Sequence, residues 1–82
     1  MDAKMEMRNS VAENRERMNK MTQKELGERT GVTQRTISYI ENNKRIPSVL
    51  LAMRISQILN VDIYDLFIDL AWEKEKQRGI RE

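Results

Sequence analysis

The sequence contains no cysteine and no histidine. Without cysteine no disulfide framework can form, and residence in the cytoplasm is the simplest expectation. Without either residue, most metal sites and most pairs of a nucleophile with its general base cannot be built. Three aspartates, Asp62, Asp65 and Asp69, fit helix capping and solvation better than a metal cluster. We therefore expect no metal site, no cofactor and no enzymatic activity.

A long hydrophobic run is also missing. Apolar residues make up 39% of the chain and charged residues 34%, and no stretch approaches the roughly 20 apolar residues of a membrane span. Residues 1–7 lack the apolar core of a signal peptide. We expect a soluble protein with no membrane partner. The 82 residues suffice for one compact core and leave little room for an effector-binding domain, so no small-molecule effector is evident.

The net charge is only +2, but it is unevenly distributed along the chain. Residues 1–61 contain eleven Lys and Arg against seven Asp and Glu, a net +4, whereas residues 62–82 contain four against six, a net −2. A basic body favours binding to a polyanion. An ordinary solvated surface explains the charge alone equally well.

The first part of the chain predicts a flexible arm followed by a helix. Residues 1–8 have no sustained periodicity and are expected to form the arm. From residue 9 to residue 19, Val11, Arg15 and Met18 recur at helical spacing. This pattern predicts a first helix with one apolar stripe and an arginine on or beside it.

The next two helices are separated by a short turn. Thr22 with Glu25 three residues later is the capping-box pattern that starts a helix, and Gly31 is typical of a helix end. Thr33 is the expected N-cap of a third helix that reaches residue 42. The polar-tipped residues of this helix that point away from the core are Gln34, Arg35, Ser38 and Tyr39.

Two further helices and an extension complete the prediction. After a turn at residues 42–45, Ser48 opens a fourth helix whose buried face includes Val49, and Asp62 opens a fifth helix that runs on to Leu70. In the C-terminal extension, residues 68–82, three apolar residues also alternate as in a short strand. We favour a helix there because residues 71–77 contain few strand formers. The expected fold is all-α, with five helices and a helical extension.

The helices on either side of Gly31-Val32-Thr33 form a candidate helix-turn-helix. The motif needs a tight turn, apolar residues that lock two short helices together, and exposed hydrogen-bonding groups on the second helix. Residues 22–41 supply all three. Many helical hairpins share this pattern, so the pattern alone favours DNA binding no more than another role.

Residues 21–48, from Met-Thr-Gln through Gly-Val-Thr and Ile-Glu-Asn to Pro-Ser, resemble the Cro and λ-repressor type of helix-turn-helix regulators, the XRE family. Leu59-Asn60-Val61 and Asp65-Leu66-Phe67 match the family's last two helices. The resemblance covers residues 9–67. It implies a compact, five-helix, λ-repressor-like domain that binds double-stranded DNA, with residues 34–41 as the recognition helix in the major groove.

The resemblance assigns base reading to the exposed face of that helix. Gln34 matches a family position that reads an adenine edge, since its amide can donate and accept at once, and Arg35 can pair with guanine through two hydrogen bonds. Ser38 and Tyr39 lie one turn further on. They suit a contact with a base, a thymine methyl or a phosphate, and for Tyr39 simple packing of the ring on the surface is an equal alternative.

The same resemblance implies a set of contacts with the DNA backbone. Gln23 matches a family residue whose amide contacts a phosphate and braces the first residue of the recognition helix. The other expected phosphate-binding residues are Thr33, Asn42, Lys44 and Arg45. Such contacts position a protein on DNA without reading its sequence.

One further pair is expected to be structural. Glu41 matches a family acid that pairs with an arginine on the first helix, and Arg15 is the matching residue here. An ion pair between helices is costly to break on one side only. The chain also departs from the common pattern: the stretch from Arg15 to Met21 is one residue longer, Asn14 replaces a core aliphatic residue, and Leu50 stands where a polar residue is usual and is expected to be exposed.

Two functions fit these observations. The first is a sequence-specific transcriptional regulator, expected to be a repressor that binds a palindromic operator as a homodimer. The alternative is an antitoxin-like or other module that keeps the DNA-binding domain and binds an unidentified protein partner through its fifth helix and extension. The end of the chain is more apolar than DNA binding requires, and a self-contact explains this more simply. The expected dimer-interface residues are Leu66, Ile68, Leu70 and Trp72. Leu66 is expected to serve the core of the monomer first, so Ile68 and Trp72 are the sharper candidates.

Overall fold

A computed structural model describes residues 8–68 of the chain. Within this range the fold consists of α1 (Val11–Arg17), α2 (Gln23–Thr30), α3 (Gln34–Glu41), α4 (Val49–Leu59) and α5 (Ile63–Leu66). The predicted all-α, five-helix architecture is confirmed. Residues 1–7 of the expected arm and residues 69–82 of the expected helical extension lie outside the described residues. None of the described helices is long and apolar enough to cross a membrane.

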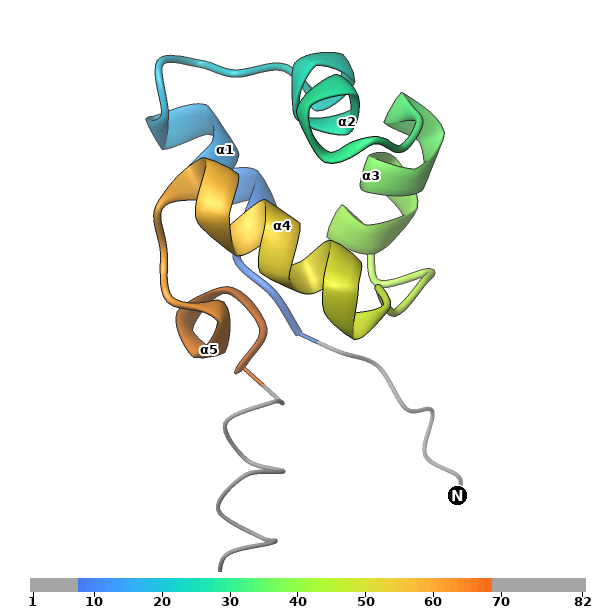
Figure 1. Cartoon of the computed structure of the whole chain (residues 1–82), viewed down its shortest axis with the longest axis vertical. Helices are drawn as coiled ribbons and strands as arrows, with labels where there is room; N and C mark the ends of the chain where they lie inside the picture. The colour runs from blue at the N-terminus through green and yellow to red at the C-terminus, as the bar shows by residue number, and fades with distance from the viewer. Residues whose placement is uncertain (1–7, 69–82) are drawn as a thin grey trace, which may run out of the picture.

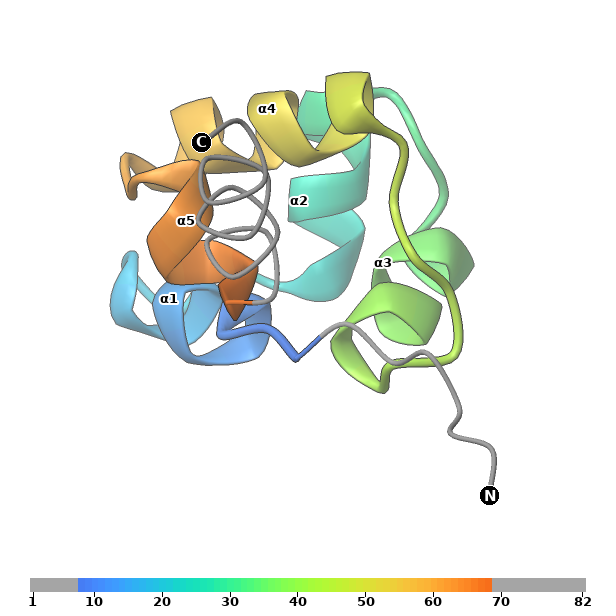
Figure 2. The same ribbon diagram turned by 90° about the horizontal axis from the view of Figure 1, so that it is seen from below.

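The helices are arranged around α4, which runs across the middle of the domain (Figure 1). α2 packs against both α3 and α4, while α1 and α5 contact α4. Both views place α3 at one edge of the molecule, away from α1 and α5 (Figures 1 and 2). α3 is therefore supported from one side and open on the other.

A single apolar core holds the helices together. Its buried members are Val11, Met21, Leu26, Ile37, Ile40, Leu51, Ala52, Ile55, Leu59, Leu66 and Phe67. Every helix contributes at least one of them. Helices of four to eleven residues are too short to be stable alone in water. Burial of these side chains, at about 1.5–3 kcal/mol for each large one, is what maintains the helices.

The predicted helix starts and stops are confirmed at α2, α3 and α4. The hydroxyls of Thr22, Thr33 and Ser48 each accept a hydrogen bond from the backbone N–H three residues later, at 3.0 to 3.1 Å. Gly31 ends α2 and Asn60 ends α4, both in the left-handed conformation, with φ of 85° and 56°. These local signals set the lengths of the helices that carry the candidate site.

The corner between α1 and α2 differs from the expectation. α1 ends at Arg17 rather than residue 19, because Asn19 and Lys20 both adopt left-handed backbone conformations, with φ of 59° and 57°. Two consecutive left-handed residues turn the chain sharply, and this accommodates the extra residue of the corner. Asn14, in place of a core aliphatic residue, donates a 2.9 Å hydrogen bond to the carbonyl of Ser10.

The fifth helix is shorter than predicted. α5 ends at Leu66 instead of continuing to Leu70, and Phe67 is extended, fully buried and bridged to Asn9. The N–H of Ser10 donates to the carbonyl of Leu66 at 2.8 Å. The beginning and the end of the domain are thus tied together by backbone hydrogen bonds, which prevents the helix from continuing through Phe67.

Candidate nucleic-acid interface

The turn between α2 and α3 depends on two glycines. A Cβ on Gly27 would lie 2.7 Å from the carbonyl oxygen of Val32, so only glycine lets the two segments approach this closely. Gly31 adopts a positive φ, which glycine tolerates without strain. The N–H groups of Gly31 and Val32 both donate to the carbonyl of Gly27, at 2.8 and 2.9 Å. The result is the tight turn that a helix-turn-helix requires.

α3 has one buried face and one open face. Ile37 and Ile40 are buried in the core, whereas Gln34 and Arg35 are exposed. Ser38 and Tyr39, which were also predicted to point outward, are half-buried. The first turn of α3 therefore offers an amide and a guanidinium to an incoming partner.

Arg35 lies over Tyr39, one helical turn away. Its Nε donates to the hydroxyl of Tyr39 at 2.9 Å, and its guanidinium carbon is 5.3 Å from the centre of the ring. Both contacts favour one orientation of the arginine side chain. Tyr39 thus restricts the motion of Arg35 in the free protein.

The residues predicted to bind phosphate are spread over three segments. Gln23 lies at the start of α2 and is half-buried, while Lys44 and Arg45 are exposed in the loop after α3. The hydroxyl of Thr33 accepts the capping hydrogen bond at the start of α3. Asn42 donates to the carbonyl of Ser38 at 2.9 Å and so satisfies the end of the same helix.

Arg15 and Glu41 form a largely buried ion pair between α1 and α3. The Nε of Arg15 lies 2.7 Å from Oε2 of Glu41, and the two side chains are only 11% and 5% exposed. A further nitrogen of Arg15 donates to the carbonyl of Met21 at 2.7 Å. The hydrogen bond with Glu41 raises the pKa of Arg15, so the guanidinium stays charged. Arg15 therefore connects two segments: the end of α3, through Glu41, and the corner before α2, through the carbonyl of Met21.

Gln23 has a different partner from the expected one. Its Nε2 donates to Oε1 of Glu41 at 2.8 Å, whereas the resemblance implied that it would brace Gln34. One amide hydrogen of Gln23 is engaged in this bond, and the amide carries a second. The carboxylate of Glu41 therefore binds Arg15 and Gln23 together.

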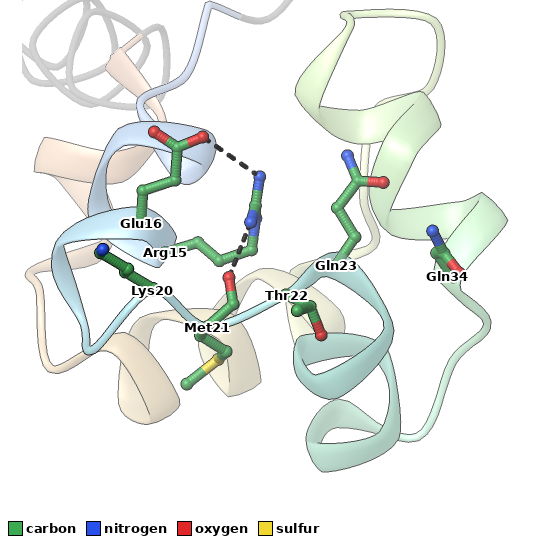
Figure 3. A pocket seen from close by; sticks show the side chains of 7 residues that line it. All are labelled: Arg15, Glu16, Lys20, Met21, Thr22, Gln23 and Gln34. Carbon is green, nitrogen blue, oxygen red and sulfur yellow. Dashed lines mark hydrogen bonds and ion pairs between the residues drawn. The ribbon is translucent and has the colours of Figure 1, made fainter.

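An open depression of about 640 Å³ lies beside this network. Its lining residues are Arg15, Glu16, Lys20, Met21, Thr22, Gln23 and Gln34. Figure 3 shows Lys20 on one side of it and Gln34 on the other, with Gln23 between them. Two predicted contact residues, Gln23 and Gln34, thus share one surface. The sequence did not single out Lys20, although the longer corner was a signal that pointed to it.

The predicted dimer interface is only partly visible. Leu66 is fully buried and serves the core of the monomer, as expected first for it, so it is not available for the surface contact also assigned to it. Ile68 is 44% exposed. Leu70 and Trp72 lie outside the described residues.

A second apolar surface was not predicted. It comprises exposed residues of the first two turns of α4 and of the segment before the helix, and its members are Ile46, Val49, Leu50 and Met53. Val49 was expected in the buried face of α4 but is 74% exposed, which corrects that prediction. Leu50 is 58% exposed, as expected. The first turn of α4 extends past the core, so its apolar residues remain in solvent.

The acidic residues at the start of α5 serve the helix. Oδ1 of Asp62 accepts a hydrogen bond from the N–H of Tyr64 at 2.8 Å, which is the capping role predicted for it. Within residues 8–68, no group of three His, Cys, Asp or Glu side chains comes together as a metal site. The described surface offers amides, hydroxyls and cations, which are the groups that contact DNA.

Comparison with known proteins extends these observations. A family model described as helix-turn-helix matches residues 11–66. An uncharacterized HTH-type transcriptional regulator of Archaeoglobus fulgidus is 42% identical over 71 residues, which cover 83% of this chain and 99% of that protein. A similar regulator of Methanothermobacter thermautotrophicus is 43% identical over 63 residues, 76% of this chain and 90% of its own. YgzD of Bacillus subtilis, also an uncharacterized HTH-type transcriptional regulator, is 39% identical over 61 residues, 74% and 91% of the two chains.

Proposed function

The chain belongs to the helix-turn-helix family of DNA-binding transcriptional regulators, and we propose that it is a repressor that binds a palindromic operator as a homodimer. The family is a class of regulators and not of enzymes. The observation that carries the proposal is the open face of α3, where Gln34 and Arg35 are exposed above a buried pair of isoleucines. Because α3 lies at an edge of the domain, a major groove can reach this face (Figure 2).

The two exposed residues have the chemistry for reading bases. The amide of Gln34 can donate to and accept from an adenine edge, and the guanidinium of Arg35 can donate two hydrogen bonds to guanine. Each such pair discriminates against a wrong base by about 1–3 kcal/mol. Tyr39 holds Arg35 in place before binding, so less side-chain freedom is lost when the base contact forms.

The residues around this face supply contacts with the backbone. Lys44 and Arg45 are exposed at the end of α3, on the loop that would follow the DNA strand. At the start of α2, Gln23 donates one amide hydrogen to Glu41 and keeps the second for a phosphate oxygen. Binding through such contacts weakens as the salt concentration rises, because each one releases counterions from the DNA.

A dimer follows from the small footprint of one recognition helix. A single helix contacts a few base pairs, and a twofold dimer doubles the site by reading two half-sites about one helical turn apart. Ile68 is the exposed apolar residue at the end of the described chain, and we assign the contact to it together with Leu70 and Trp72. We propose that this dimer represses transcription by occupying a promoter. The protein must act where the DNA is, which we take to be the cytoplasm.

One observation favours a second function. The surface formed by Ile46, Val49, Leu50 and Met53 is more apolar than DNA binding requires. Such a surface suits an antitoxin-like regulator that keeps the DNA-binding domain and also binds a protein partner. A dimer that forms without any partner supports the self-contact, and binding of a second protein at this α4 surface would support the second function.

Selection from a random DNA pool tests the proposal. The purified protein should enrich an inverted repeat whose half-sites are about 34 Å apart from centre to centre. Light scattering at micromolar concentration should give the mass of a dimer. Enrichment of a single half-site by a monomer would contradict the homodimer, and no enrichment at all would contradict sequence-specific binding.

A further inference from the structure

The corner between α1 and α2 carries a cation that the motif does not account for. We propose that Lys20 makes an additional contact with the DNA backbone, on the phosphates next to those bound by Gln23. The ligand class is the phosphodiester of double-stranded DNA. This inference rests on the proposed function and adds the α1–α2 corner to its DNA-binding surface.

The backbone of Lys20 is held firmly, while its side chain is free to move. The N–H of Lys20 donates to the carbonyl of Glu16 at 3.0 Å, and the carbonyl of the following residue, Met21, accepts from Arg15 at 2.7 Å. The side chain itself is exposed. A lysine with a fixed Cα and a long, flexible stem can place its ammonium on a nearby phosphate.

The conformation of Lys20 is unusual for its residue type. Its φ is 57°, in the left-handed region where a Cβ crowds the backbone and where glycine or asparagine is the ordinary choice. Asn19 immediately before it has the same conformation. A lysine in a strained conformation is consistent with a use for its side chain.

The position of Lys20 connects it to the predicted DNA contacts. Lys20, Gln23 and Gln34 line the same depression, with Lys20 and Gln34 on opposite sides (Figure 3). A DNA strand that passes from Gln34 over the start of α2 would continue toward Lys20.

Of the two cations that line the depression, Lys20 is the one without an ion-pair partner among the described residues. Arg15 also lines the depression, but it is paired with Glu41 at 2.7 Å and lies 3.9 Å from Glu16. Among the described residues, no carboxylate lies within ion-pairing distance of Lys20. A phosphate at the depression would therefore meet the cation of Lys20, unpaired among the described residues, although the exposed carboxylate of Glu16 also lines this depression.

A salt series on charge variants tests this contact. The variants are Lys20→Gln, which removes the charge, and Lys20→Arg, which keeps it. The matched control is Arg17→Gln, since Arg17 is exposed three residues away and lines a separate depression with Asn60 and Val61. Each variant is first shown to be folded by its thermal melt. Its affinity is then measured by fluorescence anisotropy, both for a duplex enriched from the random pool and for a scrambled duplex of the same length.

We expect Lys20→Gln to weaken binding to both duplexes by the same factor. Its plot of log affinity against log salt should be shallower by about 0.9 for each bound copy of the chain. Lys20→Arg should keep the slope of the unsubstituted protein, and so should Arg17→Gln. An unchanged slope for Lys20→Gln, or an equal loss for Arg17→Gln, would overturn the proposal. If the unsubstituted protein did not prefer the enriched duplex, the proposed function would fail instead, and the slopes on the scrambled duplex would still decide the role of Lys20.

Discussion

The two corners of this domain that flank α2 are built in different ways. The turn between α2 and α3 uses Gly31 at a positive φ and a close approach at Gly27, so its shape carries no side-chain strain. The corner between α1 and α2 makes a similar reversal with Asn19 and Lys20, both left-handed and both with side chains. The first corner has the residues that its geometry demands. The second has a lysine, Lys20, at a position that favours glycine or asparagine, and we attribute that to DNA binding.

The two corners also differ in what fixes them. The α2–α3 turn is held by its own backbone hydrogen bonds. The α1–α2 corner has such bonds too, but it is also tied to a distant residue, because Arg15 donates both to the carbonyl of Met21 and to Glu41. The α2–α3 turn is therefore sensitive to the size of the side chains within it. The longer corner is sensitive to a network that spans three helices.

The largest effect is expected from breaking this network. Arg15→Ala should reduce the free energy of unfolding by about 3 kcal/mol or more, because it leaves the nearly buried carboxylate of Glu41 without its cation. Urea unfolding measures the change, and Arg17→Ala, on the exposed side of α1, should stay within about 0.5 kcal/mol of the unsubstituted protein. A double-mutant cycle with Glu41→Ala that showed no coupling would reject the pair as a stabilising interaction.

A smaller loss is expected from filling the local turn. Gly27→Ala should destabilise the domain by about 2 kcal/mol, because the added Cβ would lie 2.7 Å from a backbone oxygen that cannot move aside alone. The midpoint of thermal unfolding is the readout. Glu28→Ala, at the next and exposed position of α2, serves as the control and should change little. Equal stability of the two variants would mean that the close approach at Gly27 does not constrain the turn.

The smallest effect should have the opposite sign. Lys20→Gly relieves the left-handed strain and should stabilise the domain by about 0.5–1 kcal/mol, after allowance for the greater freedom of glycine in the unfolded chain. Asn19→Gly should gain less, since asparagine adopts this conformation more easily. Urea unfolding of both variants gives the comparison. A loss of stability in Lys20→Gly would contradict the description of the α1–α2 corner as strained.

These contrasts explain which parts of the fold could be predicted from the sequence. The caps at Thr22, Thr33 and Ser48 and the helix ends at Gly31 and Asn60 depend on a few neighbouring residues, and all five are confirmed. Such positions follow local hydrogen-bonding rules that the sequence displays directly. The lengths of α2, α3 and α4 could therefore be predicted from the sequence.

The errors concern contacts between distant residues. Phe67 is extended rather than helical because it forms a β-bridge with Asn9, 58 positions earlier. No local sequence pattern predicts that bridge. The partner of Gln23 was missed because a carboxylate can accept from two donors, and only the fold brings Arg15 and Gln23 to the same one. Val49 is apolar and at helical spacing, yet the core ends before it. Periodicity identifies an apolar face but not how far the neighbouring elements cover it.

Arg35→Ala decides whether the open face of α3 reads the DNA sequence. The affinities of both proteins are measured for the enriched duplex and for a panel in which each base pair of a half-site is replaced in turn. We expect Arg35→Ala to lose about 1–3 kcal/mol of binding free energy for each half-site on the enriched duplex and to become indifferent at one guanine position, with its preferences elsewhere preserved. Unchanged affinity and unchanged preference at every position would show that α3 is not the reading surface.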